Sequence, residues 1–505
     1  MTIQPADETT PNVSLPPRLF TALLVAILGL GIALRLGLYF RNRALWLDEA
    51  FLALNFLHRD YAGLAQPLEF RQGAPLAYLW LTKTIATVWG YHEYALRSIS
   101  FLAGVAAFAT VYLLGRRILD RASLLIALAI CAVSAPLIRY SSELKQYSLD
   151  VLFAVVLPYA ALSCLAKPSR GPKFIALGFF GILAPWFSHA SAFVAAGIFS
   201  TTLVSMVWRR DRRSLIFFCS AFAAWALSFA INFMLVLRHT AEDKEVLSWW
   251  LSAYLPRPIY SISALKWICW SFTDMFSDPV GLVLPGLGAV AFITGAAYMA
   301  KKKPIELSLL IAPLGFAFLA AALHRYPFTG RFLLFVVPSL SLIIGVGVST
   351  IATLLGSSNR IAAASFIVLL FAQPLMLAVN SVADEPPSGM RPVIEALRQE
   401  RKPGEPLYLY HWSQFEFQYY AELNHYDPGE HVSGITSRND WAYYSRELDA
   451  FRGRGRVWFV FNNVAPKLGE GEEKYFLNRL GEMGQKVAEH KWKNARLYCF
   501  SLDHK

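Results

Sequence analysis

The sequence predicts a polytopic α-helical membrane protein, with about 11 transmembrane helices followed by a small extracytoplasmic α/β domain. Hydrophobic residues make up 55% of the 505 residues and charged residues only 16%, a balance unlike that of a soluble domain. Apolar runs long enough to cross a bilayer recur up to about residue 380. From Ser381 onward the composition becomes that of a water-soluble domain.

The predicted transmembrane helices are apolar runs of about 17 to 25 residues. The first run is longer than the core of a signal peptide and lacks a small-x-small cleavage site, so we expect it to remain attached. The runs lie approximately at residues 18–40, 97–115, 122–139, 148–166, 174–188, 189–207, 214–237, 280–299, 305–323, 331–354 and 361–380.

Basic clusters between these runs give the expected orientation in the cell (plasma or inner) membrane, because loops rich in Lys and Arg stay in the cytoplasm. They fall on the side of the N-terminal tail, residues 1–17, and an odd number of spans then places residues 381–505 outside. The same distribution assigns the net charge of +12 to topology and anionic lipid, and not to nucleic acid. The clusters are Arg116-Arg117, Lys167 to Lys173, Arg209 to Arg213, Lys301 to Lys303 and Arg360.

The C-terminal segment, residues 381–505, has the pattern of a small α/β domain that follows a linker at residues 384–387. It contains no glycine pattern for a nucleotide, and it lacks clustered acids and bases, so we expect it to assist with the acceptor of a reaction. Its predicted elements are a helix at 391–400, strands at 407–410 and 457–461, a helix at 474–483 and a final strand near 496–502.

Two expected outer segments, residues 41–96 and 239–279, are too long to be simple connections. The first carries Asp48 and Glu49 directly after the first span, and adjacent carboxylates at a membrane boundary are costly unless they serve chemistry. The alternative is an ordinary helix start, in which Asp48 caps residues 50–57 and Glu49 lies in the first turn. The second segment is rich in Trp and Tyr, which is typical of interfacial anchors but also suits a cover over a lipid or sugar.

Further polar residues gather on the expected outer side. Each has an ordinary explanation, such as snorkelling, capping a turn or meeting a lipid phosphate, but together they favour a shared polar cavity. A divalent ion could be bound by one of the two histidines with a carboxylate, but neither shows ligand spacing, so we expect no obligatory metal or other cofactor. The residues are Arg35, Arg97, Glu143, Lys145, Tyr147, His189, His324, Tyr326 and Arg331.

Three stretches resemble the motifs of a known superfamily: Trp46 to Ala50 with Gln72 to Tyr78 and Glu93 to Ser98, then Ser142 to Ser148, and Tyr326 to Phe332. They are similar to GT-C membrane glycosyltransferases, in particular dolichyl-phosphate-mannose protein mannosyltransferases (glycosyltransferase family 39) and bacterial lipopolysaccharide-core transferases that use polyprenyl-phosphate sugars. The similarity covers roughly residues 18–350. Aminoarabinose transferases of lipid A carry Glu-Lys-Pro-Pro where this chain has Gln72 to Pro75, which argues against carrying over that group's substrate or metal site.

The resemblance implies transfer of a hexose or pentose from a polyprenyl-phosphate sugar to a lipid, glycan or protein acceptor at the outer face. A departing phosphate needs positive charge, and an acceptor hydroxyl needs a base. By resemblance Asp48 is that base in an inverting displacement, Glu49 holds the loop or a sugar hydroxyl, and Arg331 leads the candidates for the phosphate, before Arg35, Arg97 and Lys145. The candidates for the cavity wall are Glu143, Tyr147, His189, His324 and Tyr326.

The main alternative is a transporter or flippase of a lipid-linked sugar, for which we would expect pseudo-repeated halves with interrupted helices. A non-catalytic assembly protein would not need clustered acids and bases on one face. A polysaccharide ligase or polymerase would carry a large outer loop rich in Arg and His late in the chain, whereas here the first loop carries the motif.

Overall fold

The computed structural model describes residues 16–166, 172–210, 212–356, 359–383, 389–436, 440–462 and 470–503. Most of the predicted N-terminal tail, the loop at 167–171, Asp211 and the linker at 384–387 lie outside these residues. The chain divides into two compact units, a helical unit of residues 1–40, 61–85 and 97–383, and an α/β unit of residues 41–60, 86–96 and 384–505. Two pieces of the first outer segment thus pack with the C-terminal domain, a grouping that the predicted chain-order domains do not contain.

The helical unit is an integral multi-pass membrane bundle. Its helices are α1 (Pro17–Phe40), α3 (Leu76–Trp89), α4 (Glu93–Ile118), α5 (Arg121–Val133), α6 (Ala135–Tyr140), α7 (Tyr147–Ala166), α8 (Pro172–Phe187), α9 (Ser191–Trp208), α10 (Arg212–Asn232), α11 (Arg238–Glu242), α12 (Lys244–Trp249), α13 (Ile262–Ser277), α14 (Pro285–Lys302), α15 (Pro304–Ala322), α16 (Val337–Gly356) and α17 (Arg360–Ala383). Residues 86–96, at the end of α3 and the start of α4, belong to the α/β unit. The helical unit also contains short 3-10 turns and one π-turn. The 3-10 turns are η1 (Gly63–Ala65), η2 (Glu69–Arg71), η4 (Leu251–Ala253) and η5 (Gly330–Val336), and the π-turn is η3 (Phe233–Leu237).

Eight helical segments among the described residues are long and apolar enough to cross a membrane, so the predicted membrane architecture is confirmed but its count of 11 spans is not. The predicted run at 122–139 is divided into α5 and α6. Pro136 lacks the N–H that a continuous helix requires, and the Ser134 hydroxyl instead accepts the Leu137 N–H at 3.4 Å. Helix α8 is too short, and α14 ends on Lys301 and Lys302 and is not among the eight.

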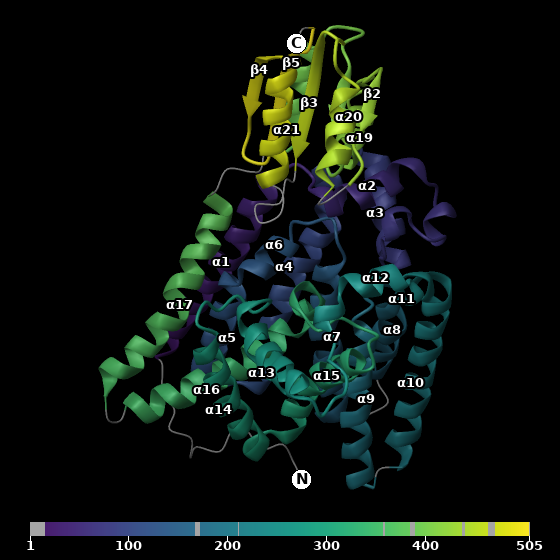
Figure 1. Ribbon diagram of the computed structural model, residues 1–505. Helices are drawn as coiled ribbons and strands as arrows, with labels where there is room; N and C mark the ends of the chain where they lie inside the picture. The colour runs from purple at the N-terminus through teal and green to yellow at the C-terminus, as the bar shows by residue number, and fades with distance from the viewer. Residues whose placement is uncertain are drawn as a thin grey trace. The chain divides into compact units, whose positions relative to one another are not determined.

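The segment that contains helix α16 is the most deeply buried of the eight, and α16 packs against α5, α14 and α17 (Figure 1). Its approach to α14 depends on glycine. A Cβ on Gly347 would lie 1.7 Å from the Ala291 carbonyl oxygen, and one on Gly295 would lie 2.0 Å from the Ile343 oxygen. Small residues let backbones of membrane helices pack this closely, and the close packing holds α14 and α16 together.

The α/β unit contains a five-stranded sheet in the order β2-β1-β3-β5-β4, with β2, β1 and β3 parallel and β5 antiparallel to both β3 and β4. The predicted strands form β1 (Leu407–Leu409), β3 (Arg456–Asn462) and β5 (Ala495–Ser501), and the predicted helices form α18 (Arg391–Glu400) and α21 (Glu470–Met483). Four further elements were not predicted from the sequence: β2 (His431–Ser433), β4 (Gln485–Lys491), α19 (Gln414–Leu423) and α20 (Trp441–Asp449). Helix α2 (Leu47–His58), from the first outer segment, completes the unit.

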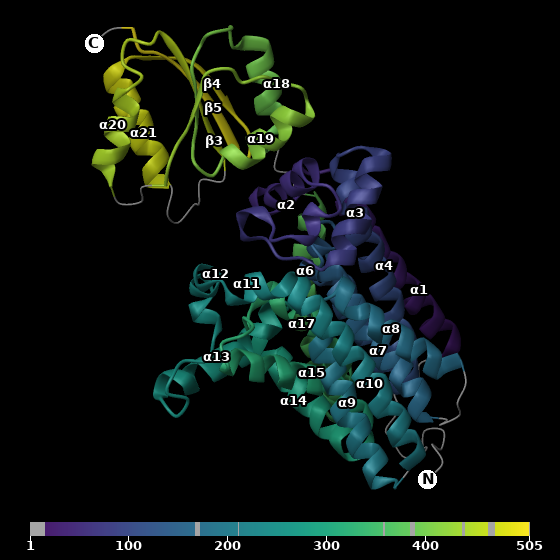
Figure 2. The same ribbon diagram turned by 90° about the vertical axis from the view of Figure 1, so that its right-hand side faces the viewer.

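Helices cover both faces of this sheet, with α20 and α21 on one side and α18 on the other (Figure 2). Alternate residues of β3, namely Val457, Phe459 and Phe461, enter the aromatic core under α20 and α21, where Tyr444 and Phe476 also lie. The buried strands are therefore apolar on both faces, which explains why β3 and β5 are recognisable in the sequence.

Candidate active site

Asp48 and Glu49 lie in the first turn of α2, within the α/β unit. The helix begins at Leu47 with Trp46 in the N-cap position, so Asp48 is inside the helix and is not its cap. Glu49 is fully buried, and its Oε2 accepts the Trp46 N–H at 3.3 Å. Asp48 is half-buried. Glu49 thus closes the turn that carries Asp48, and the capping alternative does not describe Asp48.

Arg331 lies among aromatic rings in the helical unit. Its guanidinium carbon is 5.7 Å from the ring centre of Tyr147, 5.5 Å from that of Trp250 and 5.6 Å from that of Phe332. Trp250 and Phe332 meet edge to face at 4.8 Å. Cation–π contacts favour the charged guanidinium and restrict its position without using its N–H donors. The three rings thus hold a positive charge at a defined position in the helical unit.

Lys145 is 6% exposed, and its Nζ donates to Gln72 Oε1 at 2.6 Å. Gln72 follows Phe70 and Arg71, which both have a positive φ, a strained conformation for residues other than glycine. Arg71 Nε in turn pairs with Asp243 Oδ2 at 3.0 Å. Two neighbouring residues, Arg71 and Gln72, therefore contact residue 243 of the predicted second outer segment and the buried Lys145, respectively.

Glu143 is buried and pairs with Arg139, whose Nε donates to Glu143 Oε1 at 2.6 Å. Burial, together with the Glu143 carboxylate, raises the pKa of Tyr140 to about 12. Burial also raises the pKa of Asp278, against the opposing effect of Arg139. A Cβ on Gly330 would lie 3.0 Å from Asp278 Oδ2, so this carboxyl group lies directly beside the residue before Arg331. The sequence analysis did not select Arg139 or Asp278.

The remaining outer candidates have separate surroundings. Tyr326 donates to the Phe332 carbonyl at 2.8 Å, and burial raises its pKa well above the usual value. His324 stacks on Tyr254 at 5.2 Å, and its Nε2 lies 2.9 Å from the Leu255 carbonyl oxygen. Burial lowers the pKa of His189 to about 4, so its ring is neutral at physiological pH. None of these contacts joins the two histidines.

Arg35 and Arg97 are both buried. Arg35 donates to the main-chain carbonyls of Gly31 at 2.9 Å and Cys131 at 3.1 Å, and it lies 4.7 Å above the ring of Phe108. These partners fix Arg35 between helices α1, α4 and α5. A role of either arginine in phosphate binding stays a prediction.

No group of three or more His, Cys, Asp and Glu side chains that could hold a metal ion occurs in the part of the chain that the structure describes. The absence of an obligatory metal stays a prediction as well.

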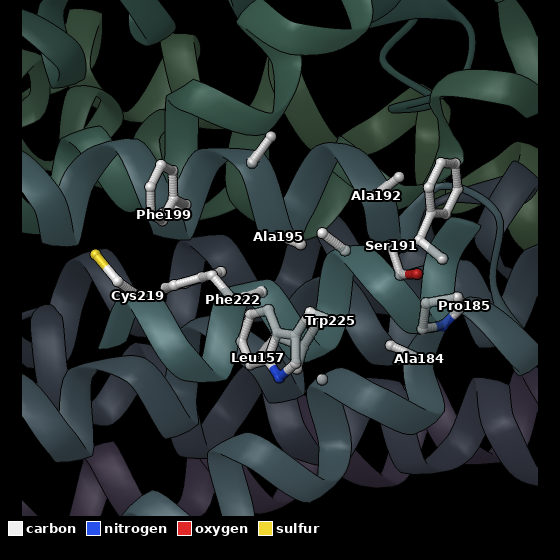
Figure 3. A pocket seen from close by; sticks show the side chains of 15 residues that line it. Leu157, Ala184, Pro185, Ser191, Ala192, Ala195, Phe199, Cys219, Phe222 and Trp225 are labelled. Carbon is white, nitrogen blue, oxygen red and sulfur yellow. The ribbon is translucent and has the colours of Figure 1, made fainter. Parts of the chain in front are cut away.

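An apolar cavity of about 540 Å³ lies between helices of the helical unit, lined mainly by α8, α9 and α10 (Figure 3). Ala184, Ala195 and Phe199 line it together with Phe222 and Trp225. The Trp225 indole fits only because residue 181 is glycine, since a Cβ there would lie 1.6 Å from the ring. The volume and the apolar lining of this cavity are those of a binding site for an apolar ligand.

Comparison by sequence gives no match: no protein-family model matches the chain, and no curated protein matches it. Solved structures match over nearly the whole chain. ArnT from Cupriavidus metallidurans bound to undecaprenyl phosphate has a TM-score of 0.53 and 12% identity, over 95% of this chain and 98% of that one. The archaeal oligosaccharyltransferase AglB from Archaeoglobus fulgidus, in complex with an inhibitory peptide and a dolichol-phosphate, has a TM-score of 0.51 and 12% identity, over 92% of this chain and 72% of that one.

A second structure of the Archaeoglobus fulgidus oligosaccharyltransferase, tethered to an acceptor peptide with the NVT sequon, gives a TM-score of 0.52 at 12% identity, over 94% of this chain and 74% of that one. At these identities the similarity concerns the fold. The GT-C fold that the sequence motifs predicted is confirmed.

Proposed function

We propose that this protein is a membrane glycosyltransferase that moves a sugar from a polyprenyl-phosphate donor to a lipid, glycan or protein acceptor at the outer face of the membrane. The proposal is supported by the fold, which it shares with ArnT and AglB, proteins whose structures contain undecaprenyl phosphate and a dolichol-phosphate. The basic loops, all expected in the cytoplasm, support the outer placement of the reaction.

The observation that carries the proposal is a series of ring contacts that links helix α9, which lines the apolar cavity, to a cationic group. Phe193, on the cavity helix α9, meets the Tyr326 ring edge to face at 4.7 Å. Tyr326 meets Phe332 at 5.7 Å, and Phe332 lies beneath the Arg331 guanidinium. A polyprenyl phosphate has an apolar chain and an anionic head, so it needs an apolar cavity and a cation on neighbouring helices.

In the proposed reaction, the oxygen of an acceptor hydroxyl attacks the anomeric carbon of the sugar. The bond from that carbon to the phosphate oxygen breaks, and polyprenyl phosphate leaves with its negative charge stabilised by Arg331 and Lys145. The hydroxyl proton passes to the carboxylate of Asp48, and the anomeric configuration inverts. Glu49 holds the turn of α2 in which Asp48 lies.

The test uses purified full-length protein in liposomes with undecaprenyl-phosphate sugars labelled in the sugar, taken from a panel of hexoses and pentoses. Membranes of cells that lack the protein supply the acceptors. We expect label to move to an acceptor and undecaprenyl phosphate to accumulate for at least one donor. Labelled donor that crosses the bilayer unchanged would instead support a flippase.

A further inference from the structure

Three side chains of the α/β unit form a hydrogen-bonded cluster, which we call the Tyr420 cluster: the buried Tyr420 and Glu93 and the half-buried Arg391. The Tyr420 hydroxyl accepts the Leu45 N–H at 2.7 Å and donates to Glu93 Oε1 at 2.5 Å. Arg391 Nε donates to the same Glu93 oxygen at 2.7 Å, and its second terminal nitrogen donates to the Asn42 carbonyl at 2.6 Å. Tyr420 is 1% exposed and Glu93 4%, so their mutual bond is shielded from water, whereas the Arg391 side chain is 37% exposed and reaches this bond from the solvent side.

The Tyr420 cluster holds the chain segment that leads into α2. Leu45, which it binds through the main-chain N–H, stands three residues before Asp48. The rest of α2 lies along α19, the helix that carries Tyr420 (Figure 1). Phe51 meets Phe415 edge to face at 4.8 Å. The start of α2 is thus fixed by directional bonds and its middle by a ring contact.

The charges keep the Tyr420 cluster intact over the working pH range. Burial and the Glu93 carboxylate raise the pKa of Tyr420 well above its usual value, so the hydroxyl keeps its proton and can donate. Burial opposes the charge of Arg391, but Glu93 and Tyr420 outweigh it and raise the pKa of Arg391. Charge-assisted bonds are short and directional, whereas apolar contacts allow helices to slide.

The geometry points to Tyr420, Glu93 and Arg391 as positioning residues for Asp48, through which the C-terminal domain takes part in catalysis by fixing the base. This inference rests on the proposed function. It differs from the expectation that the domain serves only the acceptor. None of the three needs to touch a substrate, because displacement of a catalytic group by about 1 Å can cost roughly 10²-fold in rate.

The test compares Tyr420→Phe with Tyr419→Phe in the full-length protein. Both variants lose one hydroxyl from α19, but the Tyr419 hydroxyl donates to the Tyr91 carbonyl at 2.5 Å, whereas the Tyr420 hydroxyl accepts the N–H of Leu45 in the segment before α2. We expect hydrogen exchange across residues 43–50 to become about 10-fold faster only in Tyr420→Phe. With the sugar donor that gives transfer, kcat should fall about 10-fold in Tyr420→Phe while KM for the donor stays unchanged.

The double variant with Asp48→Asn distinguishes a positioning role of Tyr420 from a merely structural one. If Tyr420 acts through Asp48, Tyr420→Phe should cause no further loss in the Asp48→Asn background. The positioning role would be overturned if Tyr420→Phe lowered kcat by the same factor in the wild-type protein and in Asp48→Asn. It would also be overturned if Tyr420→Phe alone showed wild-type hydrogen exchange and wild-type kcat. Either result would leave the proposed function intact. Near wild-type transfer by Asp48→Asn would remove Asp48 as the base and overturn the positioning role, whereas absence of transfer from every sugar donor by the wild-type protein would overturn the proposed function. If Tyr420→Phe does not fold, Glu93→Gln, which keeps size and an acceptor oxygen, must give the same pattern.

Discussion

The two units of this protein carry opposite parts of the proposed chemistry. The α/β unit holds the adjacent carboxylates Asp48 and Glu49, whereas the helical unit holds Arg331 and Lys145 and the apolar cavity. The carboxylates stand on a helix whose preceding segment is held by hydrogen bonds from the C-terminal domain, and Arg331 stands among aromatic rings of the helical unit. In the proposed function, proton transfer and donor binding therefore depend on separate packing units, and we expect variants to affect them separately.

The largest effect is expected from Asp48→Asn, which keeps size and most hydrogen bonding but removes proton affinity. Transfer should fall by at least about 10²-fold, the range associated with general-base catalysis. Binding of undecaprenyl phosphate should be unchanged, since that property belongs to the helical unit. Initial rates of transfer and lipid binding on the same preparation measure both. Asp60→Asn, an exposed acid beyond the end of α2, is the control. Near wild-type transfer by Asp48→Asn would remove it from the catalytic role.

The second prediction concerns loss of lipid binding, the property that Asp48→Asn should leave unchanged. Arg331→Gln removes a charge that can donate to phosphate, and hydrogen bonds to charged groups contribute about 1.5–3 kcal/mol. The Kd for undecaprenyl phosphate should therefore rise about 10-fold or more. The exposed Arg325→Gln is the control, since it removes the same charge from the same loop. An unchanged Kd in Arg331→Gln would assign phosphate binding elsewhere, with Lys145 next.

The third prediction concerns the cavity, whose proposed ligand is the polyprenyl chain. Ala195→Phe would fill part of the cavity and should weaken binding of undecaprenyl phosphate several-fold, with less effect on a short-chain prenyl phosphate. Val204→Phe adds the same ring on the same helix, at a side chain that is 69% exposed. Equal loss for long and short chains in Ala195→Phe would show distortion of the bundle and contradict the chain-binding role.

The sequence predicted the fold class because apolar runs and loop charges record the bilayer directly. It also predicted β3 and β5, whose apolar residues are buried on both faces. It missed β4, which is a polar edge strand, and α19, whose alternating aromatics resemble a strand. The break between α5 and α6 was visible as Pro136, but its effect on the span count was not.

For the candidate site, adjacency in sequence revealed Asp48 and Glu49, and the aromatic loop containing Trp250 was singled out without a definite role. Contacts between residues far apart in the chain could not be anticipated from one sequence. Glu93 meets Tyr420 across 327 positions, and Lys145 meets Gln72 across 73. No local pattern records such pairs, because they depend on how the elements pack.

The smallest effect on transfer is expected for His189, which tests whether the helical unit contributes a titrating group. Burial lowers its pKa from 6.5 to about 4, so the folded protein keeps this ring neutral while the unfolded chain takes up a proton below pH 6.5. Stability is therefore lost as the pH falls from about 6.5 towards 4. His189→Asn should reduce this loss and leave the pH profile of transfer between pH 6 and 8, on the order of physiological values, unchanged. Thermal unfolding midpoints measured over that acidic range check the first expectation, with the exposed His425→Asn as control. A transfer profile that shifts in His189→Asn would mean that a histidine of the membrane bundle takes part in proton transfer, and the division of labour between the two units would fail.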